Sequence, residues 1–403
     1  MTPSNGVARA APHIRQVVLK IHSRCNLRCR HCYLYESVDQ SWRDRPSVMT
    51  RATAARVAER IGEHAERHRL PWVRVVLHGG EPLLAGAELI DYAATALRAA
   101  LPARTDLQIR MQTNGILLDD AVLRVLGRHR IGVAVSLDGG QAANDRHRRY
   151  ADGRGSFDRA VRGLRRLLDP EFRRLYAGIL CTVDLGNDPI QVYEDLCEFE
   201  PPAIDLLLPL GNWTTRPPGR PAEPAETPYG DWLVAVFDRW YRSSRPEPRV
   251  RLFHSLIALL VGRGSATEAL GLNPPDIVTV ETDGGFEQSD ALRTTAEGMS
   301  ATGLDVDRHS FDDVLNAPAV RARQDPFAAL SPTCRSCSLV RVCGGGLHAH
   351  RYDAASGFAN PSVYCPDLVR LIRHVDAQVG ADLHRLVKTR LGESERAPVP
   401  ADR

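Results

Sequence analysis

Lysine is nearly absent from this 403-residue chain, because Lys20 and Lys388 are the only lysines among 52 lysine and arginine residues. We interpret this scarcity as a bias of the coding sequence rather than as a functional signal. Long apolar runs are also lacking, and none approaches the roughly 20 residues that a membrane-spanning helix needs. The N-terminal stretch lacks the apolar centre of a secretory signal. The cytoplasm is therefore the expected location.

An excess of one charge sign is missing as well. The formal net charge is +3, with 25% charged and 43% hydrophobic residues. This balance gives no reason to expect a nucleic-acid platform or a membrane-surface protein. It is typical of an ordinary globular protein, and the chain is long enough for two domains.

The nine cysteines are clustered rather than scattered. Cys181 and Cys197 lie in apolar or helical stretches, where small buried side chains are expected. The other seven form two tight groups at opposite ends of the chain: Cys25, Cys29 and Cys32, then Cys334, Cys337, Cys343 and Cys365. Clustered cysteines in a cytosolic protein are more typical of metal binding than of disulfides.

Residues 17–210 alternate between short segments rich in Val, Ile and Leu and longer helical segments. This pattern predicts repeated βα units around a parallel sheet. Six such units favour a partial or full βα barrel over a doubly wound sheet. Strands are expected over 17–23, 72–80, 106–115, 131–139, 176–184 and 204–210. Parallel α/β sheets place their chemistry at the carboxyl ends of strands, where SRCNLRCRHCY, HGGEP, QTNG and SLDGG stand here.

The remaining segments are less regular. Residues 211–226 are rich in Pro, Gly and Thr and are expected to be a linker or a substrate-facing loop. Helices follow near 228–243 and 252–262. A hairpin over 277–290 is expected to turn at Asp283-Gly284-Gly285.

The first cysteine group has the spacing CxxxCxxC, in a loop directly after the first strand. Three thiolates suit one face of a cubane iron–sulfur cluster and leave its fourth iron without a protein ligand. A zinc site is the alternative, although structural zinc normally takes four ligands, and His22 or His31 would have to complete it. The spacing favours the cluster without excluding zinc.

The context of CNLRCRHCY resembles the signature of the radical S-adenosylmethionine (SAM) superfamily, in which SAM chelates the open iron. Gly79-Gly80-Glu81-Pro82 matches the family's GGEP motif, whose backbone holds the methionine ammonium. Ser136 matches a ribose-contacting position. Arg148 matches an arginine that pairs with the SAM carboxylate, although Asn144 replaces the family's histidine. His31 stands where the family has an aromatic residue beside the adenine, so its imidazole is expected either to stack there or simply to be exposed.

The second group has the spacing CxxCxxxxxC, followed by Cys365 in NPSVYC. Spacing alone leaves zinc and iron–sulfur equally open. Downstream of a radical SAM core, the segment resembles the SPASM extension, which carries auxiliary [4Fe–4S] clusters. The resemblance implies one auxiliary cluster held by all four cysteines. Ser289 and Leu347 stand where ligands of a second auxiliary cluster would fall.

Asp290 directly follows Ser289, and in peptide-modifying relatives an aspartate at that position removes a proton during the reaction. The resemblance therefore implies a catalytic role for Asp290. The alternative is that Asp290 only caps the turn that leaves the hairpin.

Over nearly its whole length the chain resembles FxsB-type peptide maturases, which are associated with three-residue cyclophanes. Stretches that carry this resemblance include LKIHSRCNLRCRHCYLYESVDQSWR, NDRHRRYADGRGSFD and ALGLNPPDIVTVETDGGFEQSD. The family implies reductive cleavage of SAM to a 5′-deoxyadenosyl radical. That radical abstracts a β-hydrogen from a ribosomally synthesised precursor peptide, and the β-carbon then joins a nearby aromatic ring. Alternatives are formylglycine-type oxidation, thioether formation, or a non-catalytic metal-bearing peptide-binding protein.

The expected architecture is α/β: a partial (β/α)6 TIM-like barrel, the radical SAM core, with a C-terminal cysteine-rich SPASM-like extension. We expect an N-terminal arm over 1–16, the core and its following loop over 17–226, and bridging helices with a hairpin over 227–330. The auxiliary-cluster domain is expected over 331–392 and a disordered tail over 393–403. The implied partners are the precursor peptide and an external electron donor of the flavodoxin or ferredoxin type. Neither nucleic acid nor membrane is expected.

Overall fold

The computed structural model describes residues 13–220 and 226–394, and of 387–394 only the backbone. Most of the expected N-terminal arm and tail lies outside the described residues. The six expected βα strands are present as β1 (Gln16–His22), β2 (Trp72–Gly79), β3 (Asp106–Thr113), β4 (Gly132–Ser136), β5 (Tyr176–Thr182) and β6 (Ala203–Leu207). They lie side by side in chain order, each parallel to the next. A doubly wound sheet would reverse its strand order, so this sheet is the expected partial barrel.

The sheet continues beyond both ends of this six-stranded part and does not close. The order is β10-β9-β8-β1-β2-β3-β4-β5-β6-β7. β8 (Ile277–Val280) is parallel to β1, and it forms the expected hairpin with β9 (Gly285–Glu287). The outer strands are β10 (Ala301–Asp305) and β7 (Arg249–Val250). The β8–β9 hairpin thus stands directly beside the first strand of the barrel.

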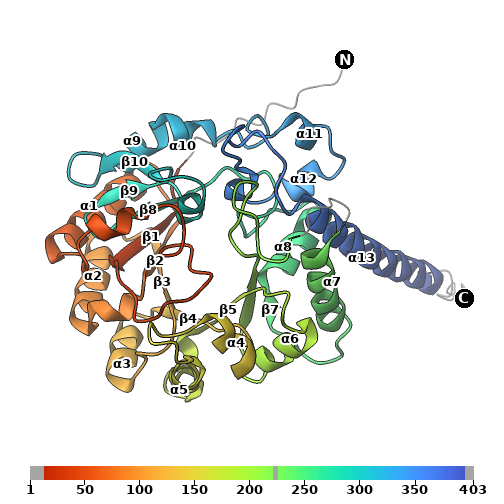
Figure 1. The fold of residues 1–403 in the computed structure, drawn as a ribbon, viewed down its shortest axis with the longest axis horizontal. Coiled ribbons are helices and arrows are strands. Elements are labelled where there is room, and N and C mark those ends of the chain that lie inside the picture. Colours follow the sequence, from red (N-terminus) through yellow and green to blue (C-terminus); the bar gives the residue numbers. More distant parts are fainter. Residues whose placement is uncertain (1–12, 221–225, 395–403) are drawn as a thin grey trace, which may run out of the picture.

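Helices cover the outside of the curved sheet (Figure 1). In the barrel they are α1 (Arg51–Arg67), α2 (Ala87–Ala100), α3 (Asp120–Arg128), α4 (Gln141–His147), α5 (Phe157–Leu168) and α6 (Pro189–Cys197). Several start at an N-cap that their sequence encodes. The side chain of Thr50 accepts a hydrogen bond from the backbone of Thr53, and Asp119 does the same for Val122. These two caps fix where α1 and α3 begin.

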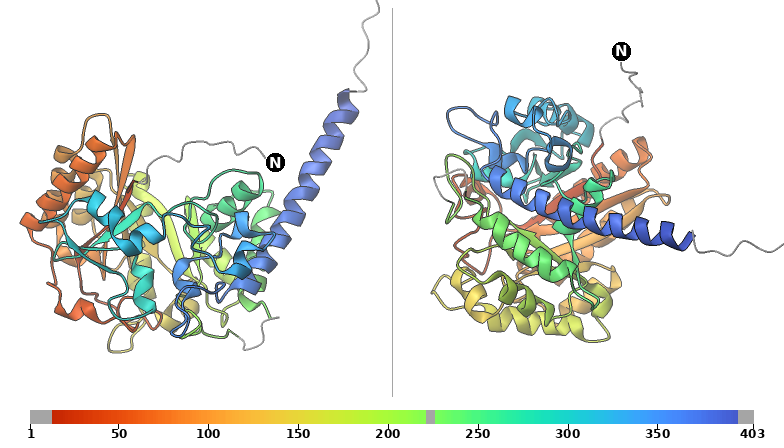
Figure 2. Two further views of the ribbon diagram at one scale, coloured as in Figure 1. Left: turned by 90° about the horizontal axis from the view of Figure 1, so that it is seen from above. Right: turned by 90° about the vertical axis from the view of Figure 1, so that its right-hand side faces the viewer.

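The C-terminal part packs beside both ends of the barrel, with α9 against α1 and α8 against β6. It contains α7 (Pro228–Tyr241), α8 (Arg251–Leu260), α9 (Phe311–Asn316), α10 (Pro318–Ala322), α11 (Pro332–Arg335), α12 (Val340–Cys343) and α13 (Cys365–Ser394). α13 packs against α7 and α8, and its far end projects from the body (Figure 2). Among the described residues, no helix is both long and apolar enough to cross a membrane.

The two faces of β1 have different environments: helices cover the outer face, and the inner face borders the interior of the barrel. Val17, Leu19 and Ile21 are fully buried on the outer face, which the helices cover. Each such side chain stabilises the fold by about 1.5–3 kcal/mol. Val18 and Lys20 alternate with them and therefore face the inside of the barrel. Side chains that would fill the centre of a closed barrel thus line an interior space here.

Candidate active site

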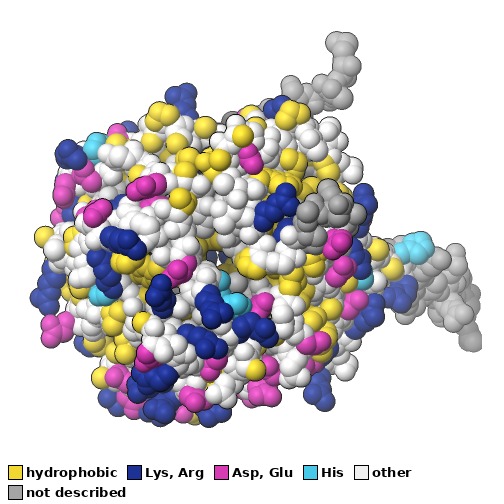
Figure 3. Space-filling model, viewed as in Figure 1, with side chains coloured by type: hydrophobic (Ala, Val, Ile, Leu, Met, Phe, Trp, Pro, Cys, Tyr) yellow, Lys and Arg dark blue, Asp and Glu magenta, His cyan; other side chains and the backbone are white. Residues whose placement is uncertain are grey.

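An interior cavity of about 430 Å³ lies within the open barrel. This volume is in the range of small-molecule sites, about 300–1,000 Å³. Figure 3 shows a hollow near the middle of the face that Figure 1 presents, with Lys and Arg side chains around it. The cavity wall includes nine of the residues predicted from the sequence: Cys25, Cys29, His31, Cys32, Gly79, Gly80, Ser136, Arg148 and Asp290. The fold therefore brings together strand-end residues that are up to 265 positions apart.

The first cysteine group lies on the loop after β1, and its thiols line the cavity. Asn114, at the end of β3, holds this loop by donating a 2.7 Å hydrogen bond to Oδ1 of Asn26. Burial raises the pKa of Cys25 to about 12 and that of Cys29 to about 11. The free thiols are therefore protonated at neutral pH, and binding a metal displaces their protons.

Gly79 and Gly80 allow β2 to pack directly against the cysteine loop. Gly79 has a φ of +142°, and a Cβ atom there would lie 2.0 Å from the carbonyl oxygen of His22. A Cβ on Gly80 would lie 1.9 Å from the hydroxyl of Tyr35 and 2.4 Å from the carbonyl oxygen of Arg24. Only glycine fits at these two positions, which leaves backbone exposed to the cavity beside the cysteines.

Glu81 lies behind this wall and is fully buried. Its carboxylate accepts hydrogen bonds from the hydroxyl of Thr113 at 2.7 Å and from the backbone of Asn114 at 2.8 Å and Leu83 at 3.0 Å. Burial raises the pKa of Glu81 to about 7, against the effect of these hydrogen bonds. The geometry makes Glu81 a link between the GGEP and QTNG loops rather than part of the cavity wall.

Ser136 and Arg148 lie on the opposite wall. The Ser136 hydroxyl accepts a 2.8 Å hydrogen bond from Gln112. Arg148 is held by two hydrogen bonds to the buried Asp138, at 2.7 and 3.1 Å. Nε and Nη2 of Arg148 are thus occupied, and any ligand carboxylate must use the remaining N–H groups. The positive charge of Arg148 lowers the pKa of Cys29, although burial has the larger and opposite effect.

The His31 ring lines the cavity and has an Nε2 atom 3.6 Å from Oδ2 of Asp138. Burial lowers the pKa of His31 to about 4, so the ring is neutral at physiological pH. The edge of its ring meets the His147 ring, with centroids 5.5 Å apart. A neutral, flat ring in the wall fits the stacking interpretation of His31 better than simple exposure.

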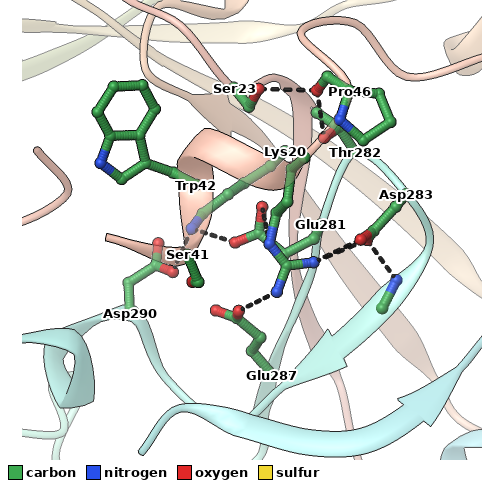
Figure 4. A network of polar contacts seen from close by, with 12 residues as sticks. Lys20, Ser23, Ser41, Trp42, Pro46, Glu281, Thr282, Asp283, Glu287 and Asp290 are labelled. Carbon is green, nitrogen blue, oxygen red and sulfur yellow. Dashed lines mark hydrogen bonds and ion pairs between the residues drawn. The ribbon is translucent and has the colours of Figure 1, made fainter. Parts of the chain in front are cut away.

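Asp290 enters the cavity from the segment that follows β9, at the start of a 3-10 helix (Asp290–Thr294). Oδ1 of Asp290 lies 2.6 Å from the Lys20 ammonium, which also lies 2.5 Å from Glu281 (Figure 4). Burial alone would raise the pKa of Asp290, but the charges of Lys20, His78 and Arg293 outweigh it and lower that pKa. Asp290 is therefore a carboxylate at neutral pH.

The second cysteine group gathers where α11, α12 and the start of α13 meet. Cys334 lies in α11, Cys343 ends α12, Cys365 begins α13, and Cys337 lies between the two short helices. The loop after Cys343 has three successive glycines, 344–346, with φ values of +61°, +77° and +69°. The buried Arg351 guanidinium donates to all three of their carbonyl groups, at 2.6–3.0 Å. This arrangement fixes the loop that follows Cys343.

The spacing of the sulfurs tests which metal group fits. A tetrahedral zinc ion with Zn–S bonds of about 2.3 Å holds its sulfurs about 3.8 Å apart. Among the described residues, no three cysteine sulfurs lie within 4.8 Å of one another. A cubane cluster is larger than a single ion and separates its thiolates more widely. Thiolates are the usual ligands of iron–sulfur clusters, so the donor atoms in both groups fit such clusters.

One other group of metal-ligand side chains lies apart from the cavity, where α1 meets α9: His64, His68 and Asp312. The backbone N–H of Ile14 donates to Nε2 of His64 at 3.1 Å, so the proton of the neutral ring is on Nδ1. That Nδ1–H faces Asp312 at 3.1 Å, and His68 lies 2.7 Å from the same carboxylate. The Asp312 carboxylate thus contacts both imidazoles of the group.

Sequence reasoning missed several cavity residues and misread others. Gln112 and His78 line the cavity, and both stand in the strand-end motifs QTNG and HGGEP, which were the available signal. Lys20 was assigned to coding bias, yet it contacts Asp290. Of residues 347–351 (LHAHR), Leu347 and His350 line the cavity, whereas the Arg351 guanidinium holds the glycine loop by hydrogen bonds.

Comparison with known proteins agrees with this geometry. Residues 19–194 match the model of the Radical SAM superfamily. A serine-type anaerobic sulfatase-maturating enzyme of Klebsiella pneumoniae is 25% identical over 346 residues, which are 81% of this chain and 79% of that protein.

Two solved structures share the fold. The structure of native anSMEcpe with bound AdoMet and Cp18Cys peptide is 18% identical, with a TM-score of 0.78, and the match covers 92% of this chain and 99% of that one. Streptococcus suis SuiB bound to precursor peptide SuiA is 14% identical, with a TM-score of 0.57 and coverage of 88% and 76%. Residues 19–194 thus match the Radical SAM superfamily, and the chain as a whole has the fold of these two solved structures.

Proposed function

We propose that this protein is a radical SAM peptide maturase that oxidises a side chain of a ribosomally synthesised precursor peptide. The observation that carries the proposal is that one cavity contains the three thiols of the CxxxCxxC loop, the Gly79-Gly80 backbone and the Asp290 carboxylate. A candidate cluster site, exposed glycine backbone and a charged group from a distant segment thus share one cavity.

Each wall of the cavity has a defined task in this proposal. Cys25, Cys29 and Cys32 would hold the [4Fe–4S] cluster, and the Gly79-Gly80 backbone, Ser136, Arg148 and the His31 ring would hold SAM. When bound, this pair supplies a 5′-deoxyadenosyl radical that removes a hydrogen atom from the substrate. The residues contribute by orienting the reactants, because such positioning can lower the activation barrier of the reaction by about 7–11 kcal/mol. Burial of the cavity keeps water from the reacting atoms.

The second cysteine group would hold one auxiliary [4Fe–4S] cluster, with four protein ligands and no open position. Ser289 and Leu347, which replace the ligands of a second auxiliary cluster, line the cavity. This part of the wall is therefore available to the peptide. Leu206, Leu208 and Leu210 line the same cavity, and an apolar wall suits an aromatic substrate side chain.

For the product, we propose a three-residue cyclophane, a bond between an aromatic ring carbon and a β-carbon. The substrate loses two hydrogens in all: one to the 5′-deoxyadenosyl radical, and one as a proton and an electron. Asp290, an ionised carboxylate in the wall, is the proposed proton acceptor. The auxiliary cluster, as an iron–sulfur oxidant, would accept the electron.

A formylglycine-type oxidation is the second candidate, because the Klebsiella pneumoniae relative is a sulfatase-maturating enzyme. It uses the same hydrogen abstraction and the same proton acceptor, so the cavity supports both reactions. The two products differ in their bonds: a cyclophane closes a ring between two residues, and formylglycine is an aldehyde on one residue.

The test uses synthetic peptides deuterated at β-carbons, one set with an aromatic residue two positions before the labelled residue and one with a single Ser or Cys. We expect deuterium in 5′-deoxyadenosine with the aromatic set. The product should then resist backbone fragmentation inside the three-residue segment and should not react with a hydrazide. A hydrazide-reactive product from the Ser or Cys set would instead establish formylglycine formation. No deuterium transfer from either set would contradict the peptide-maturase proposal.

A further inference from the structure

Lys20 occupies an unusual position for a basic residue of this chain. It is one of two lysines among 52 basic residues, and its side chain is 4% exposed on the inner face of β1. The β1–β2 register places Lys20 beside His78, and the register shifts immediately after Lys20, where the cysteine loop begins. Val18, two residues earlier on the same face, and His78 both line the cavity. Lys20 thus stands directly behind the cavity wall.

The Lys20 ammonium bridges two carboxylates of the distant hairpin segment. It lies 2.6 Å from Oδ1 of Asp290 and 2.5 Å from Oε1 of Glu281 (Figure 4). Asp290 lines the cavity, whereas Glu281 is 2% exposed. The buried Lys20 ammonium thus connects β1 to the Asp290 carboxylate in the cavity wall.

The neighbouring cations have other partners. Arg293 lies 2.8 Å from Glu281 and 2.6 Å from Glu287, and it is 3.9 Å from Asp290. Arg45 contacts Glu287 at 2.8 Å and the half-exposed Asp283 at 2.8 Å. Lys20 is therefore the cation in closest contact with Asp290.

The choice of lysine has a physical reason. A guanidinium is a planar fork that needs several acceptors in fixed directions, and Arg293 and Arg45 fill that role in this network. An ammonium is a compact point charge that fits between two oxygens from different segments. Almost all other basic residues of the chain are arginines, but a planar guanidinium does not fit between these two carboxylate oxygens as an ammonium does.

We propose that Lys20 is a positioning residue, which fixes the Asp290 carboxylate at the cavity wall so that it accepts the proton released by the oxidised substrate. This inference rests on the proposed function. In the step, an O–H bond to Asp290 forms as the C–H bond of the substrate intermediate breaks. The accompanying electron leaves to an oxidant of the iron–sulfur class. Lys20 keeps its proton throughout, because Asp290 and Glu281 raise its pKa despite burial.

Several groups face Asp290 and set its titration. Lys20 on β1, His78 on β2 and Arg293 on its own helix favour the carboxylate. Tyr33 on the cysteine loop and Glu287 on β9 also interact with it. Of these, the contact at 2.6 Å is with Lys20. Removing an opposite charge at this distance is expected to raise a carboxyl pKa by about 1–3 units.

The test titrates the Asp290 carboxyl group directly, in anaerobic apo protein labelled with ¹³C-carboxyl aspartate. The resonance is assigned by its loss in Asp290→Asn. In the wild type, Asp290 should titrate below the usual value of about 3.9. In Lys20→Met and Lys20→Gln the midpoint should move up by about 1–3 units. Arg45→Met, which removes a cation from Glu281 and Glu287, should leave it within about half a unit.

Turnover gives a second readout. The loaded Lys20→Met enzyme should still form 5′-deoxyadenosine, with at least about a tenfold lower yield of modified peptide for each one formed. A wild-type midpoint at or above about 3.9 would overturn the proposal, and so would equal shifts in Arg45→Met and Lys20→Met. Failure of the maturase proposal looks different: the wild type then modifies no peptide, while the titration still decides whether Lys20 controls Asp290.

Discussion

Arg148 in the cavity wall and the buried Asp138 form a two-point ion pair, with Nε to Oδ2 at 2.7 Å and Nη2 to Oδ1 at 3.1 Å. The Asp138 carboxylate also accepts a 2.9 Å hydrogen bond from the backbone of Thr182. Asp138 therefore joins the ends of β4 and β5 and orients the arginine that faces the cysteine loop.

Replacing Asp138 with Asn should destabilise the apo protein by about 3–5 kcal/mol, because it leaves the buried Arg148 guanidinium without a counter-charge. Denaturant unfolding measures this change. Asp152→Asn is the matched control, since it removes an exposed partner of Arg154 and should change the stability far less than Asp138→Asn does. Equal effects of the two substitutions would show that the Asp138 pair is not a buried anchor.

Replacing Gly80 with Ala should prevent the N-terminal cluster from forming. The new Cβ would lie 1.9 Å from the Tyr35 hydroxyl and 2.4 Å from the Arg24 carbonyl, so the cysteine loop must shift. Iron content after anaerobic reconstitution should fall from about eight atoms per chain to about four. Gly380→Ala, where a Cβ meets nothing within 4 Å, should keep the full content. Full iron in Gly80→Ala would contradict the packing argument.

Cys365→Ala should remove the auxiliary cluster alone, with about four irons remaining and SAM cleavage retained. Cys197→Ala provides the comparison, because Cys197 lies at the end of α6 and hydrogen-bonds with Tyr193. That variant should keep all the iron. Retention of zinc instead of iron in the wild-type C-terminal site would show that the four cysteines form a structural zinc site.

His64 should make the fold sensitive to acid. Burial, followed by the neighbouring His68, lowers the pKa of His64 to about 4, so the folded state binds the imidazole proton less well than the unfolded state. This contribution is fully present above about pH 6.5 and is lost as the pH falls toward 4, with a limit of about 3 kcal/mol. Glu81 and Glu287, whose pKa values are raised, act in the opposite sense and are common to both proteins compared.

The measurement is the free energy of unfolding of the wild type and of His64→Gln between pH 4 and 7. The wild type should lose more stability toward pH 4 than His64→Gln does. Parallel curves would mean that His64 does not carry this dependence.

Local patterns predicted most of the barrel but not its charged interior. The βα repeat, the cysteine spacings and the motifs at strand ends are local in sequence, so the six strands and the cavity-lining residues Ser136 and Gly80 could be read directly. Lys20 contacts Glu281, which is 261 positions away in the sequence, and no local sequence pattern near Lys20 predicts that contact. The scarcity of lysine is visible in the composition, but only the pairing of β8 with β1 shows that Lys20 lies beside the carboxylates of the hairpin segment.

The C-terminal helices were also hard to predict. α11 and α12 have four residues each, too few for a helical period, and their position depends on packing around the cysteines. The role of Arg351 was equally hard to predict, because its three hydrogen-bond acceptors are carbonyl groups of a glycine loop. The sequence pattern does not specify the conformation of that loop. Glu81 was assigned to the cofactor site with its motif, whereas its hydrogen bonds to the next loop place it behind the wall.

The most direct test of the account is SAM cleavage by anaerobically reconstituted protein under a low-potential reductant. The account predicts about eight irons per chain and formation of 5′-deoxyadenosine and methionine. Replacing Cys25, Cys29 and Cys32 together by Ala should remove the N-terminal cluster and abolish the formation of both products. That triple variant should keep about four irons in the C-terminal cluster. Wild-type protein that holds its iron, binds SAM and forms no 5′-deoxyadenosine would contradict the central claim.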